Sequence, residues 1–582
     1  MGIPNLLSTL EPFAQPSQLD RRHVVIDGPA LAYHILHKCT ANGFVEPSYE
    51  LLGGSMIAWL DALASHDVTV EAIYFDAFLP SSKRPTRLDR VQKSTIQLIR
   101  LFSKCPYGLP IQIESPKALD RTALFDVSGQ PAQQKHFPLQ PPFLVPSIID
   151  ALKASDKYRD LVQLVPGEAD EYCARHAFKA TPACILTSDS DLLVHDLPEG
   201  TGVVFLRDIY TADDNALSCA LFTQSEISAQ FEVSCTRLAY ERERLPQATL
   251  NQLRRICLEE TPDDILFRRF CQQYVQTEEG SRKIPLTSQY LDPRLSEVVY
   301  QLSDRSGPQP DMFLPMLTDS PLRTSAWEPS LDLRAMGYSL AAQACKSRHK
   351  TLREHRKIQN ITERNEHHKV RNISQHKGTS VELSVHTAKA FMTQLTSLLK
   401  SCADSKRREN EPAWLLACLA VDIQDHMKIE KRSWSLVMLQ NPEKPSKKSK
   451  LHSWDITHVT AHFLATLYSF RLVDQILRAL PAGALKELQP GLQDLKEHIS
   501  SIVPPLADFP TVASIAELFQ DPKLVATLRN RLDEILGLAD DEAEGSDESV
   551  EQAPAKKKQK TGPATSGGRK TNNIFDLLAE EQ

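Results

Sequence analysis

The sequence predicts an α/β fold for residues 1–245 and a mostly helical second half. Up to about residue 245, short apolar runs without polar alternation alternate with helical patterns, whereas from 246 onward the strand signal vanishes. Apolar strands separated by helices are typical of a parallel sheet that helices cover on both faces. The expected strands are 22–27, 68–76, 161–165, 183–187 and 202–206.

Helical patterns fill most of the intervals between these strands, at 30–36, 56–64, 147–154 and 168–180. The exception is 104–146, which is rich in Pro, Gln and Lys and has weak periodicity. We interpret it as an irregular insertion over one edge of the sheet, serving either as a substrate lid or as a surface insertion without a role.

The second half is expected to form a helical domain over 246–538, with clear apolar periodicity at 384–402, 411–426, 454–479 and 513–537. A basic segment, 345–377, holds ten Lys or Arg against three Glu. It is interpreted either as a contact for a phosphate backbone or as a solvated linker or helix face. Residues 539–582 form a low-complexity tail that is expected to be disordered.

Composition excludes several classes of protein. The chain of 582 residues carries 67 Lys or Arg and 74 Asp or Glu, so it is not a uniformly basic binder. It has no run of eighteen apolar residues, so we expect no membrane span. Its eleven cysteines include no Cys-x-x-Cys pair, which argues against a disulfide framework or a zinc ribbon.

Acidic residues recur where the predicted strands end. Because the carboxyl ends of parallel strands meet at one edge of a sheet, we expect their side chains to share that edge. Each acid also has a structural explanation, as a helix N-cap or as a complement to a helix dipole. The six acids that follow four of the strands are Asp27, Asp76, Glu168, Asp170, Asp189 and Asp191.

Six carboxylates in one cleft would repel each other unless cations neutralise them. Oxygen ligands suit Mg²⁺, with Mn²⁺ as an alternative, whereas the absence of interleaved His and the unpaired Cys173 and Cys184 argue against zinc. Two such ions support phosphodiester hydrolysis. The acids therefore predict metal-dependent phosphoryl chemistry.

The sequence resembles the flap endonuclease/XPG superfamily of nucleases, whose nuclease domain is PIN-like. Its closest subgroup is the asteroid-like XPG-domain proteins. The resemblance rests on the combination and order of five motifs: Met1–Leu7, Val24–Gly28, Tyr74–Asp76, Pro166–Ala174 and Thr187–Leu193.

By this resemblance the six acids occupy the family's metal-ligand positions, and Gly2 matches a glycine near the family's active site. Lys83 and Arg84 are similar to a basic cluster beside the scissile phosphate, which continues with Arg87, Arg90 and Lys93. A solvated helix face is the alternative interpretation of these cations.

The chain also departs from this family. The Gly-x-Asp-Tyr segment that carries a seventh acid is absent, and the sequence does not choose among Asp208, Asp213 and Asp214 as a substitute. The Gly-rich helix–hairpin–helix turn is absent as well, and 104–146 has too many prolines for two arch helices. The chain must therefore bind duplex DNA in a different way from the flap nucleases.

We therefore expect a Mg²⁺-dependent, structure-specific nuclease that acts on DNA, or on RNA, as in DNA repair. The alternative is a weak or inactive XPG-like scaffold that works in post-transcriptional control or signalling by binding nucleic acid or protein. The sequence does not distinguish endonuclease from 5′ exonuclease action.

Two short segments of the tail suggest partners. The basic run Lys556–Lys560 is typical of a nuclear localisation signal, so we expect a nuclear protein. An additional cytoplasmic location is the alternative. The apolar run Ile574–Leu578 suggests a helical peptide that docks into a partner's groove, and a frayed end is the alternative.

Overall fold

The computed structural model confirms the mixed α/β architecture and the helical second half. It describes residues 3–78, 83–111, 115–126, 140–179, 184–274, 291–357, 378–403, 412–440, 451–481, 485 and 488–537. Gly2, residues 358–377, Lys556–Lys560 and Ile574–Leu578 lie outside these ranges, so the predictions made for them stay predictions. No helix in the described ranges is long and apolar enough to cross a membrane.

The centre of the first half is a parallel sheet in the order β7-β6-β2-β3-β5. All five predicted strands are present, as β2 (His23–Asp27), β3 (Thr69–Phe78), β5 (Val162–Pro166), β6 (Cys184–Thr187) and β7 (Gly202–Phe205). The sequence did not predict the antiparallel strands that extend the β7 edge, β9 (Leu217–Phe222) with β1 (Gln15–Gln18) and β8 (Tyr210–Thr211).

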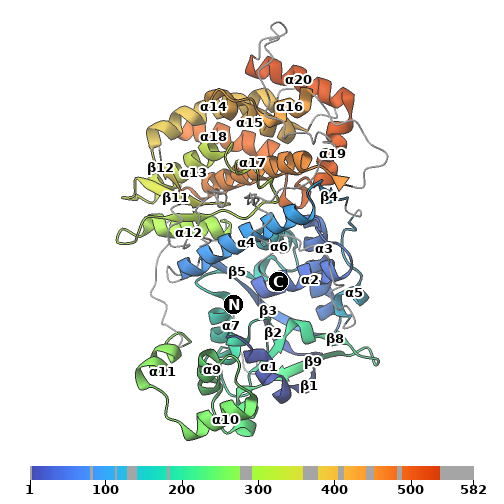
Figure 1. Cartoon of the computed structure of the whole chain (residues 1–582), viewed down its shortest axis with the longest axis vertical. Coiled ribbons are helices and arrows are strands. Elements are labelled where there is room, and N and C mark those ends of the chain that lie inside the picture. The colour runs from blue at the N-terminus through green and yellow to red at the C-terminus, as the bar shows by residue number, and fades with distance from the viewer. Residues whose placement is uncertain are drawn as a thin grey trace, which may run out of the picture.

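Helices cover both faces of this sheet (Figure 1). On one face α2 (Gly28–Ala41), α3 (Tyr49–Ala64) and α6 (Leu144–Ala154) share an apolar core with the sheet. On the other face lie α1 (Leu6–Leu10), α7 (Ala169–Ala177), α8 (Gln224–Phe231) and α9 (Cys235–Arg244). Both faces are therefore buried, as expected for strands that lack polar alternation.

The core on the α7 face extends beyond residue 245. Leu253 of α10 (Leu250–Glu259) and Phe270 of α11 (Asp264–Cys271) belong to the same apolar cluster as Ile3 and Leu10. In Figure 1 the helices α9, α10 and α11 form a lobe at the lower left, beside α1 and α7. This lobe borders the first half rather than the helical half.

The described part of the 104–146 insertion is largely irregular. It follows a long basic helix, α4 (Arg84–Lys104), and contains the short α5 (Arg121–Phe125). It also contributes β4 (Leu109–Pro110), which pairs with β13 (Leu451–His452) of the second half.

The second half is built around α17 (Trp454–Ala479), which is buried along most of its length. Its other helices are α12 (Pro293–Ser303), α13 (Leu331–Ala344), α14 (Val385–Ala403), α15 (Ala413–Lys428), α16 (Trp434–Gln440), α18 (Gln489–Ile502), α19 (Val512–Gln520) and α20 (Pro522–Leu536). The periodic run 513–537 is two helices, because Asp521 caps a new helix that starts at Pro522.

A small sheet in this half was missed by sequence reasoning. It consists of β10 (Asp311–Phe313), β11 (Thr351–His355) and β12 (Thr379–Glu382). Strand β11 lies within the basic segment 345–377, and the side chains of 354–357 are buried. For this part of the segment both earlier interpretations are wrong, because buried side chains neither face solvent nor reach a phosphate backbone. Carboxylates within the fold pair with these cations instead.

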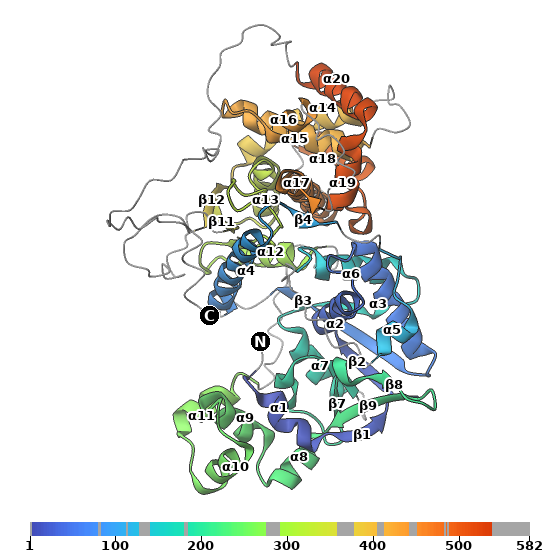
Figure 2. The same ribbon diagram turned by 45° about the vertical axis from the view of Figure 1, so that its right-hand side comes forward.

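The two halves meet along α4, which runs beside α12 in both views (Figures 1 and 2). Arg84 forms an ion pair with Asp311, and Arg87 forms one with Glu297. The ring of Phe78, at the end of β3, stacks on Tyr300 of α12 with centroids 4.1 Å apart. The end of β3 and the start of α4 are therefore fixed against the helical half.

Candidate active site

The sheet order places the predicted acids side by side. Strands β6, β2, β3 and β5 are consecutive neighbours and run in parallel. Asp27 is the last residue of β2, and Asp76 lies near the end of β3. Glu168 follows β5 as the N-cap of α7, and Asp189 follows β6 as the N-cap of the 3₁₀ helix Ser190–Leu193. We call these four acids, together with Asp170 and Asp191, the acid edge.

Asp27 is positioned by the abrupt change from β2 to α2. Its Oδ1 accepts a hydrogen bond from the Ala30 N–H at 3.1 Å, and its Oδ2 accepts one from the Thr187 hydroxyl at 2.8 Å. A Cβ on Gly28 would lie 2.6 Å from the Phe75 ring, so only glycine lets the helix start this close to β3. The predicted capping role is therefore real, and it coexists with a place at the acid edge.

The other acids are tied to neighbouring elements in the same way. Asp76 accepts from the Ala169 N–H at 2.7 Å, which joins β3 to the start of α7. Asp191 accepts from the Ile3 N–H at 2.8 Å, which brings the N-terminal segment to the acid edge. Asp189 accepts from the Asp191 N–H at 3.0 Å. Backbone donors therefore fix where these carboxylates sit.

Burial and mutual repulsion raise the pKa values of four of these acids. Burial, together with the charges of Asp27 and Glu168, raises the pKa of Asp76 to about 7. Burial and Asp189 raise the pKa of Asp27 and of Asp191 to about 6. The pKa of Asp170 lies well above its ordinary value because of burial and the charge of Glu168. These contributions link each of the six acids electrostatically to at least one other acid of the set.

One predicted cation reaches the acid edge. The Lys83 ammonium lies 2.8 Å from Glu168 Oε1. Burial would lower the pKa of Lys83, but Glu168, Asp170 and Asp191 together raise it. Arg84 points elsewhere, with its Nε 2.6 Å from Asp311 Oδ2, and Lys93 pairs with Asp89 on its own helix. Lys83 thus pairs directly with the acid edge, whereas Arg87, which is paired with Glu297, acts on Asp76 only through its charge.

Sequence reasoning missed three residues beside the acid edge. His195 Nε2 lies 3.9 Å from Asp170 Oδ2, and burial lowers the pKa of this imidazole to about 4. The Tyr274 hydroxyl donates to Asp191 Oδ2 at 3.5 Å. Burial, Asp191 and then Glu243 raise the pKa of that hydroxyl, so Glu243 acts on it through its charge. No strand precedes these residues, so the pattern that revealed the acids could not reveal them.

The three acids weighed as substitutes for a seventh ligand are less well placed. Asp213 and Asp214 are exposed, and Asp214 accepts from the Ala216 N–H within its own turn. Asp208 lies beside Arg207 at 3.5 Å. Glu243, whose charge acts on the Tyr274 hydroxyl, is the better candidate.

The donor set fits a hard cation in its chemistry. It consists of carboxylates alone, and their raised pKa values report a negative potential that a divalent ion would relieve. Among the residues that the structure describes, no three His, Cys, Asp or Glu side chains are already arranged to hold a metal ion. Ion binding would therefore require side-chain rearrangement at the acid edge.

Comparison with known families supports the resemblance. Residues 140–367 match the model of a family described as XPG domain containing. Residues 140–367 are thus similar to an XPG domain. The match supports an XPG-like nuclease family, whereas the asteroid-like subgroup stays a prediction. No curated protein gives a significant match to the chain.

The matched range of the XPG domain does not coincide with the sheet. It contains Glu168, Asp170, Asp189 and Asp191, whereas Asp27 and Asp76 precede it. It also continues through α12, α13 and β11 of the helical half. The family pattern thus extends from the sheet into the helical half.

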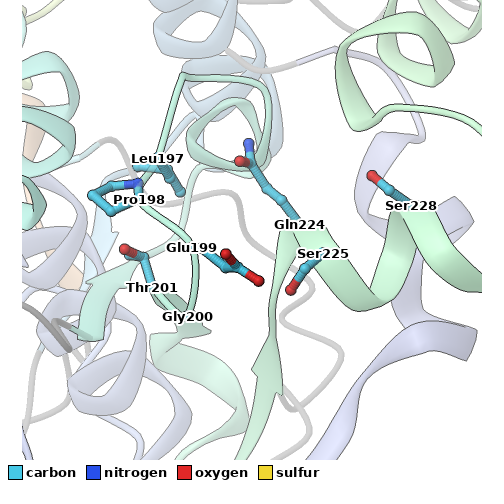
Figure 3. Close-up of a pocket in the computed structure, with 8 residues that line it drawn as sticks. All are labelled: Leu197, Pro198, Glu199, Gly200, Thr201, Gln224, Ser225 and Ser228. Carbon is cyan, nitrogen blue, oxygen red and sulfur yellow. The ribbon is translucent and has the colours of Figure 1, made fainter.

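A hollow of about 260 Å³ lies away from the acid edge (Figure 3). The loop 197–201, which lines it with the start of α8, leads into β7, so the hollow sits at the amino end of that parallel strand. Figure 3 shows the Gln224 amide turned away from Glu199, and this amide donates to the Leu193 and His195 carbonyls. The hollow contains none of the six acids.

Proposed function

We propose that the acid edge hydrolyses phosphodiester bonds in DNA or RNA with the help of divalent cations. The observation that carries this proposal is the set of six acids on four adjacent strand ends, four of them with raised pKa values. Buried like charges lower the stability of the protein unless a bound cation compensates them. An arrangement of this kind is expected at a functional site and not in a purely structural sheet.

Each residue has a distinct task in this proposal. The carboxylates of Asp27, Asp76, Glu168, Asp170, Asp189 and Asp191 would hold Mg²⁺ or Mn²⁺, and Glu243 would add a carboxylate near Asp191. The ions, when bound, supply charge neutralisation at the phosphate and activation of water. Lys83 neutralises phosphate charge. Its ion pair with Glu168 holds it at the acid edge, where the phosphate would bind. Arg84 has no such task, since Asp311 holds it.

Binding of the ions also changes protonation. Metal ligands must be deprotonated, so the raised pKa values of Asp27 and Asp76 mean that cation uptake releases protons near neutral pH. We therefore expect cation affinity, and cleavage with it, to rise as the pH increases from about 6 to about 8.

Cleavage by the purified chain tests the proposal. Flap, nicked and single-stranded DNA and single-stranded RNA are incubated in Mg²⁺ or Mn²⁺ with wild type and with Asp189→Ala/Asp191→Ala. Wild type should cleave at least one substrate, and the double variant should lose activity by more than about a hundredfold. Asp213→Ala, which removes an exposed acid outside the acid edge, should remain fully active.

A scaffold without activity is the second candidate. It is favoured because no three side chains in the described part of the chain are pre-arranged for a metal. Calorimetry distinguishes the two. A scaffold predicts no Mn²⁺ uptake and no cleavage of any substrate, whereas the nuclease predicts uptake that disappears in the double variant. Entry into the nucleus through Lys556–Lys560 and partner docking through Ile574–Leu578 remain separate proposals.

A further inference from the structure

A cavity of about 350 Å³ borders the acid edge on the side of the α9–α11 lobe. The loop 194–196, the helices α8 and α9, and the end of α11 enclose it. The rings of His195, Phe267 and Tyr274 line it, together with hydroxyl groups such as that of Thr236. This cavity shares Gln224 and Ser228 with the hollow in Figure 3, but it extends to His195 and Tyr274, which lie beside the acids.

Aromatic packing fixes one wall of the cavity. Phe267 packs edge-on against Tyr240 with centroids 5.1 Å apart, and Tyr274 packs against Phe270 at the same distance. His195 meets the Tyr274 ring edge-on at 5.4 Å, with an interplanar angle of 89°. These rings hold each other in place, so the wall presents aromatic surface without requiring side chains to become ordered on binding.

Two of these rings connect the cavity to the acids. Tyr274 donates to Asp191, and His195 Nε2 lies 3.9 Å from Asp170. The His195 side chain is buried, with 5% of its surface exposed, and its Nδ1 has no hydrogen-bond partner among the described residues. A buried polar atom without a partner is costly, which indicates that a ligand completes this site.

The lining excludes some ligands. Among the described residues that form the cavity there is no Lys or Arg, and Asp196 is negatively charged. A phosphate group is therefore an unsuitable occupant. A flat, neutral ring system with hydrogen-bonding edges suits the aromatic wall, the hydroxyl groups and the free nitrogen of His195.

We propose that this cavity receives one unstacked nucleobase from the strand whose phosphate lies at the acid edge. The proposal rests on the proposed nuclease function. Proteins that act on nucleic acid take single bases out of the stack and hold them between aromatic side chains and hydrogen-bonding groups. The cavity volume is near the lower end of the range of small-molecule sites, which suits a ligand the size of one nucleoside. The acid edge would then act on single-stranded or unpaired nucleotides.

Nucleosides test the cavity independently of catalysis. Adenosine, guanosine, cytidine and thymidine carry no phosphate, so they are titrated into the full chain in EDTA and followed by saturation-transfer NMR. At least one should bind, and Thr236→Trp, which fills the cavity, should abolish the signal. Ser225→Trp is the matched control, because Ser225 lines the hollow of Figure 3 and not the cavity.

A second, more conservative variant tests the cavity in case Thr236→Trp fails to fold. Phe267→Leu keeps an apolar side chain and removes the aromatic face, so it should weaken nucleoside binding by about five- to a hundredfold, the range for loss of one base–aromatic stack. Circular dichroism and thermal midpoints establish that each variant is folded.

The outcomes separate this inference from the nuclease proposal. Cleavage without nucleoside binding, at a rate that Phe267→Leu and Thr236→Trp leave unchanged, would overturn the base site and preserve the nuclease. Nucleoside binding that both variants weaken, in a chain that cleaves nothing, would support the base site and refute the nuclease. Nucleoside binding that neither variant changes would place the ligand elsewhere and overturn the inference.

Discussion

The acid edge and the interior of the helical half both bury charge, but they treat it in opposite ways. At the acid edge, burial and neighbouring acids raise the pKa of Asp76 to about 7. In the helical half, burial would raise the pKa of Glu354, but Arg334 and Arg356 outweigh it and lower that pKa to about 2. The carboxylates at the acid edge repel one another, whereas the buried carboxylate in the helical half is neutralised by neighbouring arginines.

The second set, which we call the arginine cluster, satisfies nearly every donor of its central residue. Arg334 and Glu354 are fully buried and joined by two hydrogen bonds, from Nε to Oε1 at 2.7 Å and from Nη2 to Oε2 at 2.9 Å. Arg334 Nη1 donates to the hydroxyls of Ser330 and Ser469. Arg356 completes the cluster, with its Nη2 2.8 Å from Glu354 Oε2.

This difference separates buried charge that holds a fold together from buried charge that serves a ligand. A buried ion with a complete set of partners has a structural explanation within the chain. Buried acids whose nearest charged neighbours are mostly other acids lack one, and an external cation is the simplest remedy. Three experiments test this distinction, and the largest expected effect comes first.

Replacing Arg334 with Met should cause the largest loss of stability. The substitution leaves Glu354 buried without its main partner, so we expect the free energy of unfolding to fall by about 3–5 kcal/mol. Urea denaturation of wild type and Arg334→Met measures it. The control Lys157→Met removes an exposed pair with Asp61 and should cost less than about 1 kcal/mol. Equal losses in the two variants would show that the arginine cluster stabilises the fold no more than an exposed ion pair does.

Replacing Asp76 with Asn should have the opposite sign in the metal-free protein. A carboxyl whose pKa is raised on folding stabilises the fold below its unfolded pKa, and that contribution is lost as the pH rises through the folded value. For Asp76 the window runs from the ordinary value of 3.8 to about 7. At pH 8 in EDTA, Asp76→Asn should therefore be more stable than wild type by on the order of 1–3 kcal/mol.

The pH profile sharpens this second test. Between pH 4 and pH 7 the free energy of unfolding should fall less steeply for Asp76→Asn than for wild type, whose Asp27, Asp76 and Asp191 all contribute to the slope. Asp213→Asn, at an exposed position, should follow wild type. Lower stability of Asp76→Asn at pH 8 would mean that the acid edge is internally compensated.

The smallest effect on stability is expected for Lys83→Met. The Lys83–Glu168 pair is partly exposed, with 44% and 36% of the side chains accessible, so its loss should change stability by less than about 1 kcal/mol. Cleavage should nevertheless fall by about tenfold to a thousandfold, because Lys83 neutralises phosphate charge. Arg84→Met, which breaks the pair with Asp311, should show the reverse, with lower stability and little direct effect on the chemical step. Unaltered cleavage by Lys83→Met would remove Lys83 from the proposed mechanism.

The sequence by itself determined the parallel sheet and the acids at its edge. Strands buried on both faces must be continuously apolar, so β2, β3, β5, β6 and β7 can be recognised as local patterns. Each of the six acids lies at the end of its strand or in the short segment that follows it. The strands β1 and β9 were missed because they pair over a sequence separation of about 200 residues and have no comparable local signature.

Only the tertiary structure decided which charges meet. Lys83 and Arg84 are adjacent in the chain, yet one faces Glu168 and the other faces Asp311, because α4 lies between the two halves. The segment 354–357 has the charged composition of an exposed segment but is buried, since its partners Arg334 and Asp319 come from elsewhere in the chain. Tyr274, which follows α11 in the chain, contacts Asp191 and packs on His195. Coulomb interactions depend on distance in space, and that distance is settled only when the chain has folded.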